Sequence, residues 1–431
     1  MVDTIHPATL PYLLYANDKG EICDLPDLAM AGRSGRDLQT PQLNELIPLP
    51  EGSELFVLDD RMPIGIDSNS GEFLKLEDDP HQPGRSVRAV AAFMAPAHTA
   101  IYSTAFEKKS AGVKPLPLFA YAAVGWHDNR FWVSGFRSDS DPRQEPDRFK
   151  PARIRKATNR RLRENPANRL IQHLGKCSLT YGCPAAVNYF MDSWEAPLPT
   201  SPVCNAACIG CISLQPSGCC PATQDRIKFT PSPEEIAGVA LPHLEKVDGG
   251  VVSFGQGCEG EPLMQADIIE KSIKLIRKKT ARGTINLNSN SSMPTAIEKL
   301  AAAGLDSLRV SLNSARADYH RRYYRPKGFD LDNVKESIRV MKRAGRFVSL
   351  NYFMLPGFTD DPAEFGALGN LIDDCRPDFV QLRNLNMDPD WYLDEIKFSP
   401  AGPALGILNW LERLREAFPH LEFGYFNPPL N

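Results

Sequence analysis

The chain has 431 residues, of which 42% are apolar and 24% charged, a composition typical of folded globular proteins rather than of disordered chains. Its 49 basic and 53 acidic residues give a net charge of −4, which excludes a chain-wide polycation but leaves room for a local basic patch. No apolar run approaches the roughly 20 residues that span a bilayer, and the N-terminal residues lack the pattern of an export signal. The sequence therefore predicts a cytoplasmic protein of roughly two or three domains with no membrane partner.

Residues 1–141 are expected to form a β-rich accessory and recognition domain. Residues 54–58 are a short apolar run, and residues 118–136 predict a β-hairpin that turns at residues 127–129. The aromatic residues of this hairpin either form a binding face or pack within a half-buried sheet, and their residue types favour the sheet.

Residues 142–199 are predicted to be a basic linker with a short helix. The segment 142–169 carries ten basic and three acidic residues, and a helix over residues 150–164 would place several basic side chains along one side. These are Arg153, Lys156, Arg160 and Arg163. Such a face is either a solvated helix between two domains or an electrostatic footprint for RNA or an acidic peptide.

Strand-like and helix-like segments alternate from residue 200 to residue 431. The strand-like apolar runs are residues 250–254, 284–290, 307–312, 347–354 and 379–385. The helical segments are residues 233–247, 265–280, 294–303, 331–344, 362–374 and 400–418. With one more strand just before Cys204, this order predicts an α/β fold: a partial (β/α)6 TIM-like barrel with a C-terminal helix and strand. Active groups are then expected at the carboxyl ends of the strands.

Eight of the ten cysteines are clustered in residues 177–258, which indicates metal ligands rather than disulfides in a chain without an export signal. Cys204, Cys208 and Cys211 follow the first expected strand on one loop, with three and two residues between them. Thiolates bind both zinc and iron–sulfur clusters. Three of them can hold three corners of a [4Fe–4S] cube and leave the fourth iron open. The alternative is a zinc-stabilised binding module without catalytic activity.

Three further segments appear in the order of a known family. Residues 257–262 read Gly-Cys-Glu-Gly-Glu-Pro, residues 308–313 read Leu-Arg-Val-Ser-Leu-Asn, and residues 354–357 read Met-Leu-Pro-Gly. Together with the cysteine loop they resemble the radical S-adenosylmethionine (radical SAM) superfamily from about residue 201 to residue 398. The first segment is similar to the family's Gly-Gly-Glu-Pro motif, with Glu259 in place of the first glycine. The second resembles its Val-Ser-Leu-Asp strand, and the third lies where a family segment packs beside adenine.

The resemblance implies that Cys204, Cys208 and Cys211 are metal ligands and catalytic residues holding a [4Fe–4S] cluster. The residues that it implies for binding S-adenosylmethionine are Gly260, Glu261, Pro262, Ser311, Asn313, Leu355 and Pro356. Because Gly210 stands where the family often has an aromatic residue, adenine is expected to pack against Ile209, Ile212 or the segment at Leu355.

Asn288 is added to the cofactor-binding residues on a different ground. Asn286, Asn288 and Asn290 alternate along one strand, so they share a face that we place toward the barrel interior. Buried amides need hydrogen-bond partners, which either a bound ligand or the backbone of nearby loops would supply.

The resemblance also implies the chemistry. In such enzymes a low-potential electron donor, such as flavodoxin or ferredoxin, drives cleavage of S-adenosylmethionine to a 5′-deoxyadenosyl radical that abstracts hydrogen from the substrate. The proteins are therefore oxygen-sensitive. The substrate itself stays open between a peptide or protein recognised by the N-terminal domain and an RNA bound by the basic segment.

Other cysteines leave room for a second metal site. Cys177, Cys183, Cys219 and Cys220 are enough for a second cluster or a zinc ion. Cys258 is expected to be either a hydrogen donor or a buried small residue, and the buried residue is favoured.

Overall fold

The structure is a computed structural model that describes residues 10–142, 145, 148–215 and 220–430. Its contacts divide the chain into two compact units. Unit 1 comprises Met1–Ser140, Phe353–Gly366 and Leu382–Ala417, and unit 2 comprises Asp141–Tyr352, Ala367–Gln381 and Phe418–Asn431. Across the described ranges, no helix is both long and apolar enough to cross a membrane.

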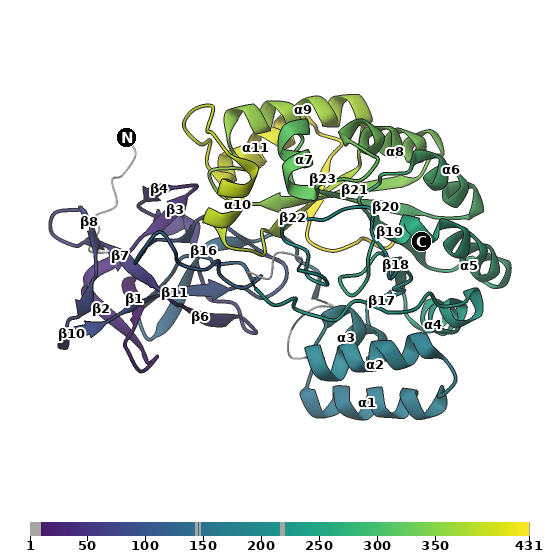
Figure 1. Ribbon diagram of the computed structural model, residues 1–431, viewed down its shortest axis with the longest axis horizontal. Helices are drawn as coiled ribbons and strands as arrows, with labels where there is room; N and C mark the ends of the chain where they lie inside the picture. The colour runs from purple at the N-terminus through teal and green to yellow at the C-terminus, as the bar shows by residue number, and fades with distance from the viewer. Residues whose placement is uncertain (1–9, 143–144, 146–147, 216–219, 431) are drawn as a thin grey trace. The chain divides into compact units, whose positions relative to one another are not determined.

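A seven-stranded sheet runs through the second half of the chain (Figure 1). Its strands are β17 (Glu195–Pro197), β18 (Val251–Phe254), β19 (Thr284–Ser289), β20 (Ser307–Leu312), β21 (Phe347–Met354), β22 (Phe379–Asn384) and β23 (Glu422–Gly424). They lie side by side in chain order, and the pairs from β17 to β21, as well as β22 with β23, are parallel. The predicted partial barrel is therefore confirmed as an open parallel sheet, and its first strand does precede Cys204.

Helices follow the strands along the chain, and several of them cover one side of this sheet (Figure 1). They are α4 (Pro233–Lys246), α5 (Ala266–Lys279), α6 (Pro294–Ala303), α7 (Ala317–Tyr324), α8 (Leu331–Arg343) and α9 (Pro362–Cys375), with a short 3₁₀ helix at Pro262–Gln265. Local sequence explains their ends. At the start of α4 the hydroxyl of Ser232 accepts the N–H of Glu235, whose carboxylate accepts the N–H of Ser232, and Pro233 occupies the first helical position.

Three helices precede β17: α1 (Pro151–Glu164), α2 (Arg169–Tyr181) and α3 (Pro184–Phe190). The helix expected over residues 150–164 is α1. Helices α1 and α2 approach closely at Gly175, where a Cβ atom would lie 2.6 Å from the side chain of Leu162. Helix α2 ends at Gly182, which takes the left-handed conformation (φ 59°) that glycine adopts without strain.

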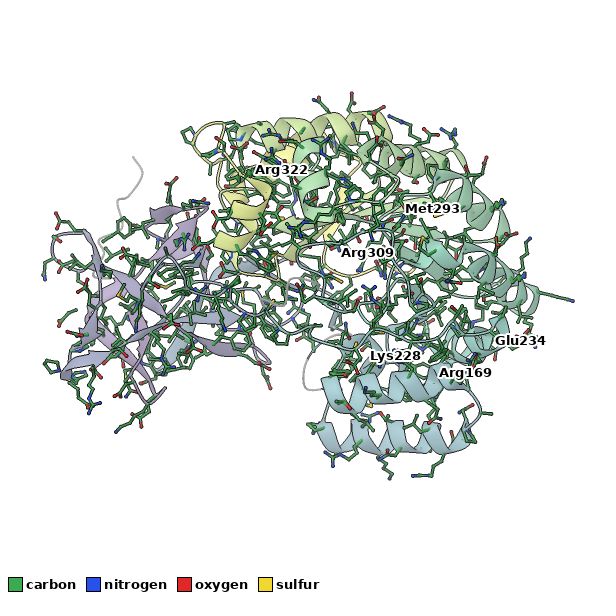
Figure 2. The ribbon with its side chains drawn as sticks, viewed as in Figure 1. Arg169, Lys228, Glu234, Met293, Arg309 and Arg322 are labelled. Atoms are coloured by element: carbon green, nitrogen blue, oxygen red, sulfur yellow. The ribbon has the colours of Figure 1, made fainter. Side chains whose placement is uncertain are left out.

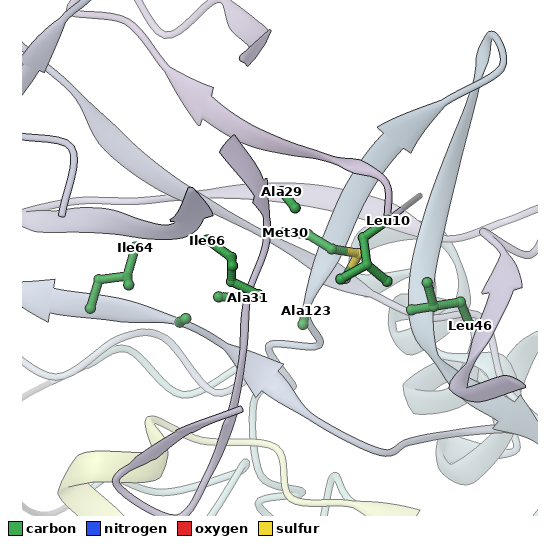
Figure 3. Close-up of a cluster of buried hydrophobic side chains, with 9 residues drawn as sticks. Leu10, Ala29, Met30, Ala31, Leu46, Ile64, Ile66 and Ala123 are labelled. Atoms are coloured by element: carbon green, nitrogen blue, oxygen red, sulfur yellow. The ribbon is translucent and has the colours of Figure 1, made fainter. Parts of the chain in front are cut away.

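Unit 1 is β-rich, as expected for the N-terminal region. Its strands are β1 (Tyr12–Ala16), β2 (Ile22–Met30), β3 (Gly32–Ser34), β4 (Asp37–Gln39), β5 (Leu46–Pro48), β6 (Glu54–Leu58), β7 (Arg61–Asp67), β8 (Phe73–Lys75), β9 (Asp78–Asp79), β10 (Gln82–Ser86), β11 (Arg88–Phe93), β12 (His98–Ala100), β13 (Ser103–Thr104), β14 (Phe106–Lys108), β15 (Val124–His127) and β16 (Arg130–Arg137). Antiparallel pairing runs in the order β12, β16, β15, β1, β2, β7, β14. Figure 3 shows one of its buried clusters, in which Met30 and Ile66 pack with Leu10.

The predicted hairpin is formed by β15 and β16. Its turn residues Asp128 and Asn129 have positive φ angles of 49° and 56°, a conformation that these two residue types tolerate well. The rings of Trp126 and Phe131 lie 4.6 Å apart and pack against the buried cluster that contains Val133. The hairpin aromatics thus belong to a half-buried sheet, as their residue types favoured.

A late segment of the chain completes unit 1. It contains α10 (Pro389–Ile396) and α11 (Ile407–Ala417). Arg61 on β7 pairs with Asp388 at 2.6 Å, and their side chains are only 2% and 0% exposed. Asp388 also accepts the N–H of Leu116 and two N–H groups at the start of α10. This buried ion pair fixes the start of α10 to β7 within unit 1.

Candidate functional site

The cysteine loop is held by its main chain. The N–H of Ala207 donates to the carbonyl of Tyr324 at 2.9 Å, and the N–H of Ile209 donates to that of Tyr323 at 3.1 Å. The N–H of Lys327 donates to the carbonyl of Asn205. The loop is therefore fixed to the C-terminal end of α7 by backbone hydrogen bonds, and the placement of its thiols follows from the fold itself.

The three thiols of this loop are half-buried and close enough to influence one another. Burial raises the pKa of Cys204, and burial together with the neighbouring Cys211 and Cys204 raises the pKa of Cys208 well above its usual value. Arg226 donates to the Sγ atom of Cys211 at 3.5 Å. A cationic metal centre beside these thiols would stabilise them as thiolate ligands. The donor set therefore fits an iron–sulfur cluster.

Glu259 joins two loops of the site. Its buried carboxylate accepts four backbone N–H groups at 2.8 Å each, from Thr200, Ser201, Gly255 and Gln256. Burial raises the pKa of Glu259 to about 7, although these four donors pull it down. The residue that departs from the family motif thus connects the segment after β17 with the loop after β18.

Gly260 lies where the two segments touch. Its N–H donates to the carbonyl of Ser201 at 2.7 Å, and the next N–H, of Glu261, donates to that of Val203 at 2.9 Å. A Cβ atom at Gly260 would lie 2.1 Å from the carbonyl oxygen of Val203. The close backbone approach therefore requires glycine. Pro262 is buried and begins the 3₁₀ helix.

Glu261 extends the connection to a third loop. Its buried carboxylate accepts the hydroxyl of Ser289 at 2.6 Å, the N–H of Asn290 at 2.9 Å and the N–H of Leu263 at 3.1 Å. Burial raises the pKa of Glu261 to about 7. A carboxylate has about four acceptor positions, and donors from the described residues occupy three of those of Glu261.

Asparagine side chains add further hydrogen bonds between these loops. Asn290 donates to the side chain of Asn205 at 2.8 Å, and Asn205 donates to the hydroxyl of Ser292 at 2.9 Å. The loops that follow β17, β18 and β19 are thereby joined at the carboxyl ends of these strands, which is the edge where active groups were expected.

The buried amides of β19 find their partners within the chain. Asn288 donates to the carbonyl of Gly255 at 3.1 Å and accepts from Asn286 at 2.7 Å. Asn286 also bonds the hydroxyls of Ser253 and Ser307. A bound ligand and the chain itself were the two kinds of partner considered for these amides. The structure shows partners from the chain, and contact of Asn288 with a cofactor stays a prediction.

A polar chain continues across the strands. Arg309 on β20 donates to Gln381 at 3.3 Å, Gln381 donates to Asn427 at 2.8 Å, and Asn427 donates to Glu195 at 2.9 Å (Figure 2 labels Arg309). Sequence analysis missed Asn427 and Glu195. Asn427 follows the last strand outside any motif, and Glu195 belongs to a strand of three residues that has no apolar alternation.

The other predicted cofactor residues lie on two different units. Ser311 is half-buried on β20, opposite Asn351 in register, and Asn313 is buried just after the strand and donates to the carbonyl of Tyr319 at 3.4 Å. Leu355 and Pro356 belong to unit 1, where the N–H of Gly35 donates to Pro356 at 2.6 Å. The cofactor contacts predicted for these four residues stay predictions.

The remaining cysteines have different surroundings. Cys177 and Cys258 pack together in one buried cluster, with Cys183 against it. Cys220 is buried elsewhere on the cysteine-rich segment, and Cys219 lies outside the described residues. Of the four cysteines considered for a second site, the structure therefore brings Cys177 and Cys183 together and adds Cys258.

Comparisons with known proteins point to one family. The radical SAM superfamily matches residues 198–366. GTP 3′,8-cyclase of Lactiplantibacillus plantarum is 24% identical over 202 residues, which are 42% of this chain and 57% of that protein. The probable dual-specificity RNA methyltransferase RlmN of a Synechococcus strain is 28% identical over 167 residues, 38% of this chain and 45% of that protein. The chain thus spans about half the length of these curated relatives.

One solved structure that is similar to this chain is the FeFe-hydrogenase maturase HydG of Carboxydothermus hydrogenoformans. It has 15% identity and a TM-score of 0.37 over 63% of this chain and 70% of that one. A radical SAM methyltransferase of Sphaerobacter thermophilus has 15% identity and a TM-score of 0.35 over 52% and 63% of the two chains. The family implies a [4Fe–4S] cluster and S-adenosylmethionine as cofactors. The matched segment contains the cysteine loop as well as Glu259, Gly260 and Glu261, so residues 198–366 carry the sequence pattern of the radical SAM superfamily.

Proposed function

We propose that this protein is a radical SAM enzyme that binds a [4Fe–4S] cluster through Cys204, Cys208 and Cys211 and abstracts hydrogen from a substrate not yet identified. The observation that supports it best is the main-chain fixation of three adjacent thiols beside the loop of Gly260 and Glu261. When bound, the cluster supplies the electron for reductive cleavage of S-adenosylmethionine.

Several residues of the chain support that reaction by positioning. Ser213 lies 3.7 Å from the Sγ atom of Cys211 and donates to the carbonyl of Glu259 at 3.0 Å, which connects the cysteine loop to the loop after β18. Arg226 donates to both Cys211 and Ser213. A cationic donor at one sulfur withdraws electron density from it, and such hydrogen bonds raise the reduction potential of a cluster. Arg226 is therefore a positioning residue that tunes Cys211.

Radical SAM enzymes need a reductant, and we propose a flavodoxin or a ferredoxin. The direct test uses anaerobically purified and reconstituted protein, in which iron and sulfide are measured per chain. Dithionite and S-adenosylmethionine are then added, and 5′-deoxyadenosine is quantified. We expect about four irons per chain and slow formation of 5′-deoxyadenosine.

Matched variants make this test specific. Cys208→Ala should lose iron and cleavage, whereas Cys375→Ala, which removes a buried thiol on α9, should keep both. Zinc instead of iron on the cysteine loop, or full cleavage by the Cys208→Ala protein, would overturn the proposed function.

For the substrate we propose a peptide or protein. The support is the presence of unit 1, which has its own buried clusters and consists of residues outside the loops that carry the thiols and Glu261. The test is anaerobic turnover with candidate peptides. Substrate-dependent formation of 5′-deoxyadenosine above the abortive rate would support a peptide.

The surface of α1 favours RNA as a second candidate. Arg153, Arg155 and Lys156 are exposed there and make no ion pair with the described residues. Binding of RNA through such a face weakens steeply with salt, because counterions are released from the phosphates. Arg155→Glu with Lys156→Glu should then abolish binding at low salt. Binding that is insensitive to both salt and this double substitution would exclude α1 as the RNA contact.

A further inference from the structure

A second group of metal-ligating side chains lies in unit 2 on elements other than the cysteine loop. His173 and Cys177 lie on α2, and Cys258 lies in the loop after β18. One nitrogen of His173 and the Sγ atoms of Cys177 and Cys258 all lie within 4.8 Å of one another. The Nε2 atom of His173 is 3.6 Å from the Sγ atom of Cys177.

Local structure brings these residues together with a third thiol. His173 and Cys177 are four residues apart, so they share one face of α2. The chain then turns at Gly182, and the N–H of Cys183 donates to the carbonyl of Cys177 at 3.1 Å. The side chain of Cys183 packs against the buried cluster of Cys177 and Cys258.

The geometry matches a single ion better than a cluster. Tetrahedral zinc with Zn–S and Zn–N bonds of about 2.3 Å and 2.0–2.1 Å places sulfur and nitrogen ligands about 3.5 Å apart. The ligands of a [4Fe–4S] cube bind different irons and are spread more widely. The 3.6 Å separation of Cys177 from His173 therefore favours a mononuclear site.

Electrostatics agree with a cation at this place. Cys177 and Cys258 are both buried, and hydrogen bonds from Cys258 and His173 lower the pKa of Cys177 below its usual value. Buried charge is costly unless it is paired or bound to a metal. Lys176, whose charge acts on Cys177, is engaged at 2.6 Å with Asp225 on the surface.

We propose that His173, Cys177 and Cys258 bind one zinc ion and that Cys183 supplies the fourth ligand. Binding displaces the protons that remain on the cysteine thiols, and three thiolates with one Zn²⁺ leave a net charge of −1. The site is closed and structural. It connects α2 to the loop after β18. In this loop Cys258 is followed by Glu259, whose carboxylate accepts four backbone N–H groups.

The test uses the full chain with the iron site removed. In the Cys204→Ala, Cys208→Ala, Cys211→Ala protein we expect about one zinc per chain by mass spectrometry. Replacement of zinc by Co²⁺ should give the intense thiolate-to-cobalt and d–d absorption of a tetrahedral sulfur-rich site. His173→Ala and Cys258→Ser, added to this background, should bind less than about a tenth of that zinc. Cys375→Ser should bind it fully.

If these variants do not fold, a measurement on the unsubstituted protein tests the same proposal. Zinc should slow alkylation of Cys177 and Cys258 by iodoacetamide, and a chelator should restore it, while the alkylation of Cys23 stays constant. Absence of zinc, a Cys177–Cys258 disulfide in the protein purified without reductant, or full zinc content in the His173→Ala protein would each overturn the proposal. None of these results bears on the iron bound by the cysteine loop.

Discussion

The two groups of thiols in unit 2 differ in what surrounds them. Cys204, Cys208 and Cys211 come from one half-buried loop, held by carbonyl groups of α7. Cys177 and Cys258 are buried, come from separate elements, and have an imidazole among them. Catalytic metal sites keep an open position, and structural sites are closed by protein ligands. The contrast agrees with the chemistry proposed for the first group and with the structural zinc ion proposed for the second.

Substituting one cysteine of each group in turn is the strongest test of this comparison. Cys208→Ala should reduce formation of 5′-deoxyadenosine by at least about 10³-fold, because an incomplete ligand set does not hold the cluster, while zinc content stays unchanged. Cys177→Ser should lose zinc, keep iron, and slow cleavage about 10–100-fold, as is typical when the support of a site is weakened. Iron, zinc and product are measured on the same preparations. Loss of iron in the Cys177→Ser protein would contradict the separation of the two sites.

Replacing Glu259 tests how much the loops after β17 and β18 depend on the carboxylate that connects them. Glu259→Gln replaces an acceptor of four N–H groups by one oxygen and an NH₂ group, so buried donors lose their partner. We expect the free energy of unfolding of the metal-free protein to fall by about 2–4 kcal/mol. Urea unfolding provides the measurement. Glu234→Gln, at an exposed position of α4, should change it by less than about 0.5 kcal/mol; equal effects of the two substitutions would mean that the carboxylate is dispensable.

Low pH should destabilise α7, the helix to which the cysteine loop is hydrogen-bonded. His320 on α7 is buried beside Tyr324, and burial lowers its pKa to about 4. The folded protein thus favours neutral His320, so its stabilising effect is complete above pH 6.5 and is lost as the pH falls toward 4, by about 3 kcal/mol at most.

The check on this pH dependence is urea unfolding of the metal-free protein at pH 7 and pH 5. His320→Phe should flatten the difference, because its neighbours Tyr324 and Phe329 are aromatic. His81→Gln, at an exposed position, should leave it unchanged. An undiminished pH dependence in the His320→Phe protein would assign the acid sensitivity to other groups, such as His243, whose pKa burial also lowers to about 4.

The smallest expected effect concerns the fourth ligand of the zinc site. Cys183→Ala should weaken zinc affinity about 10–100-fold without removing the ion, because His173, Cys177 and Cys258, whose ligand atoms already converge, all remain and water can take the vacant position. Competition with a chromophoric chelator measures this change. Affinity equal to that of the unsubstituted protein would show that Cys183 does not contribute to the site.

Much of the sheet was predictable because its signals are local. Strands β20 and β21 begin and end where their apolar runs do, and α4 begins at the Ser232 and Pro233 pair that the capping pattern favours. The cysteine loop was equally local, since its three thiols lie within eight residues. The domain boundaries and the individual cofactor contacts stay predictions.

Long-range partners were not predictable from the sequence alone. His173 and Cys258 are far apart in the chain, and no spacing rule pairs a helix face with a loop after a distant strand. The spacing of His173 and Cys177 on one helix face was the available indication, but it is common without a metal. Glu259 likewise reads as a departure from a motif until its four amide partners are seen.

The pairing of Arg61 with Asp388 has a consequence for synthesis. At about 5–20 residues per second, Asp388 leaves the ribosome at least roughly 12 seconds after residue 140, so a nascent N-terminal region carries an arginine whose counter-charge does not yet exist. Burying such a group alone costs several kcal/mol. A chain that stops at residue 352 should therefore be cleaved readily by protease where the longer chain resists. Most of unit 1 is therefore synthesised before unit 2, but unit 1 cannot finish folding until Asp388 has been made.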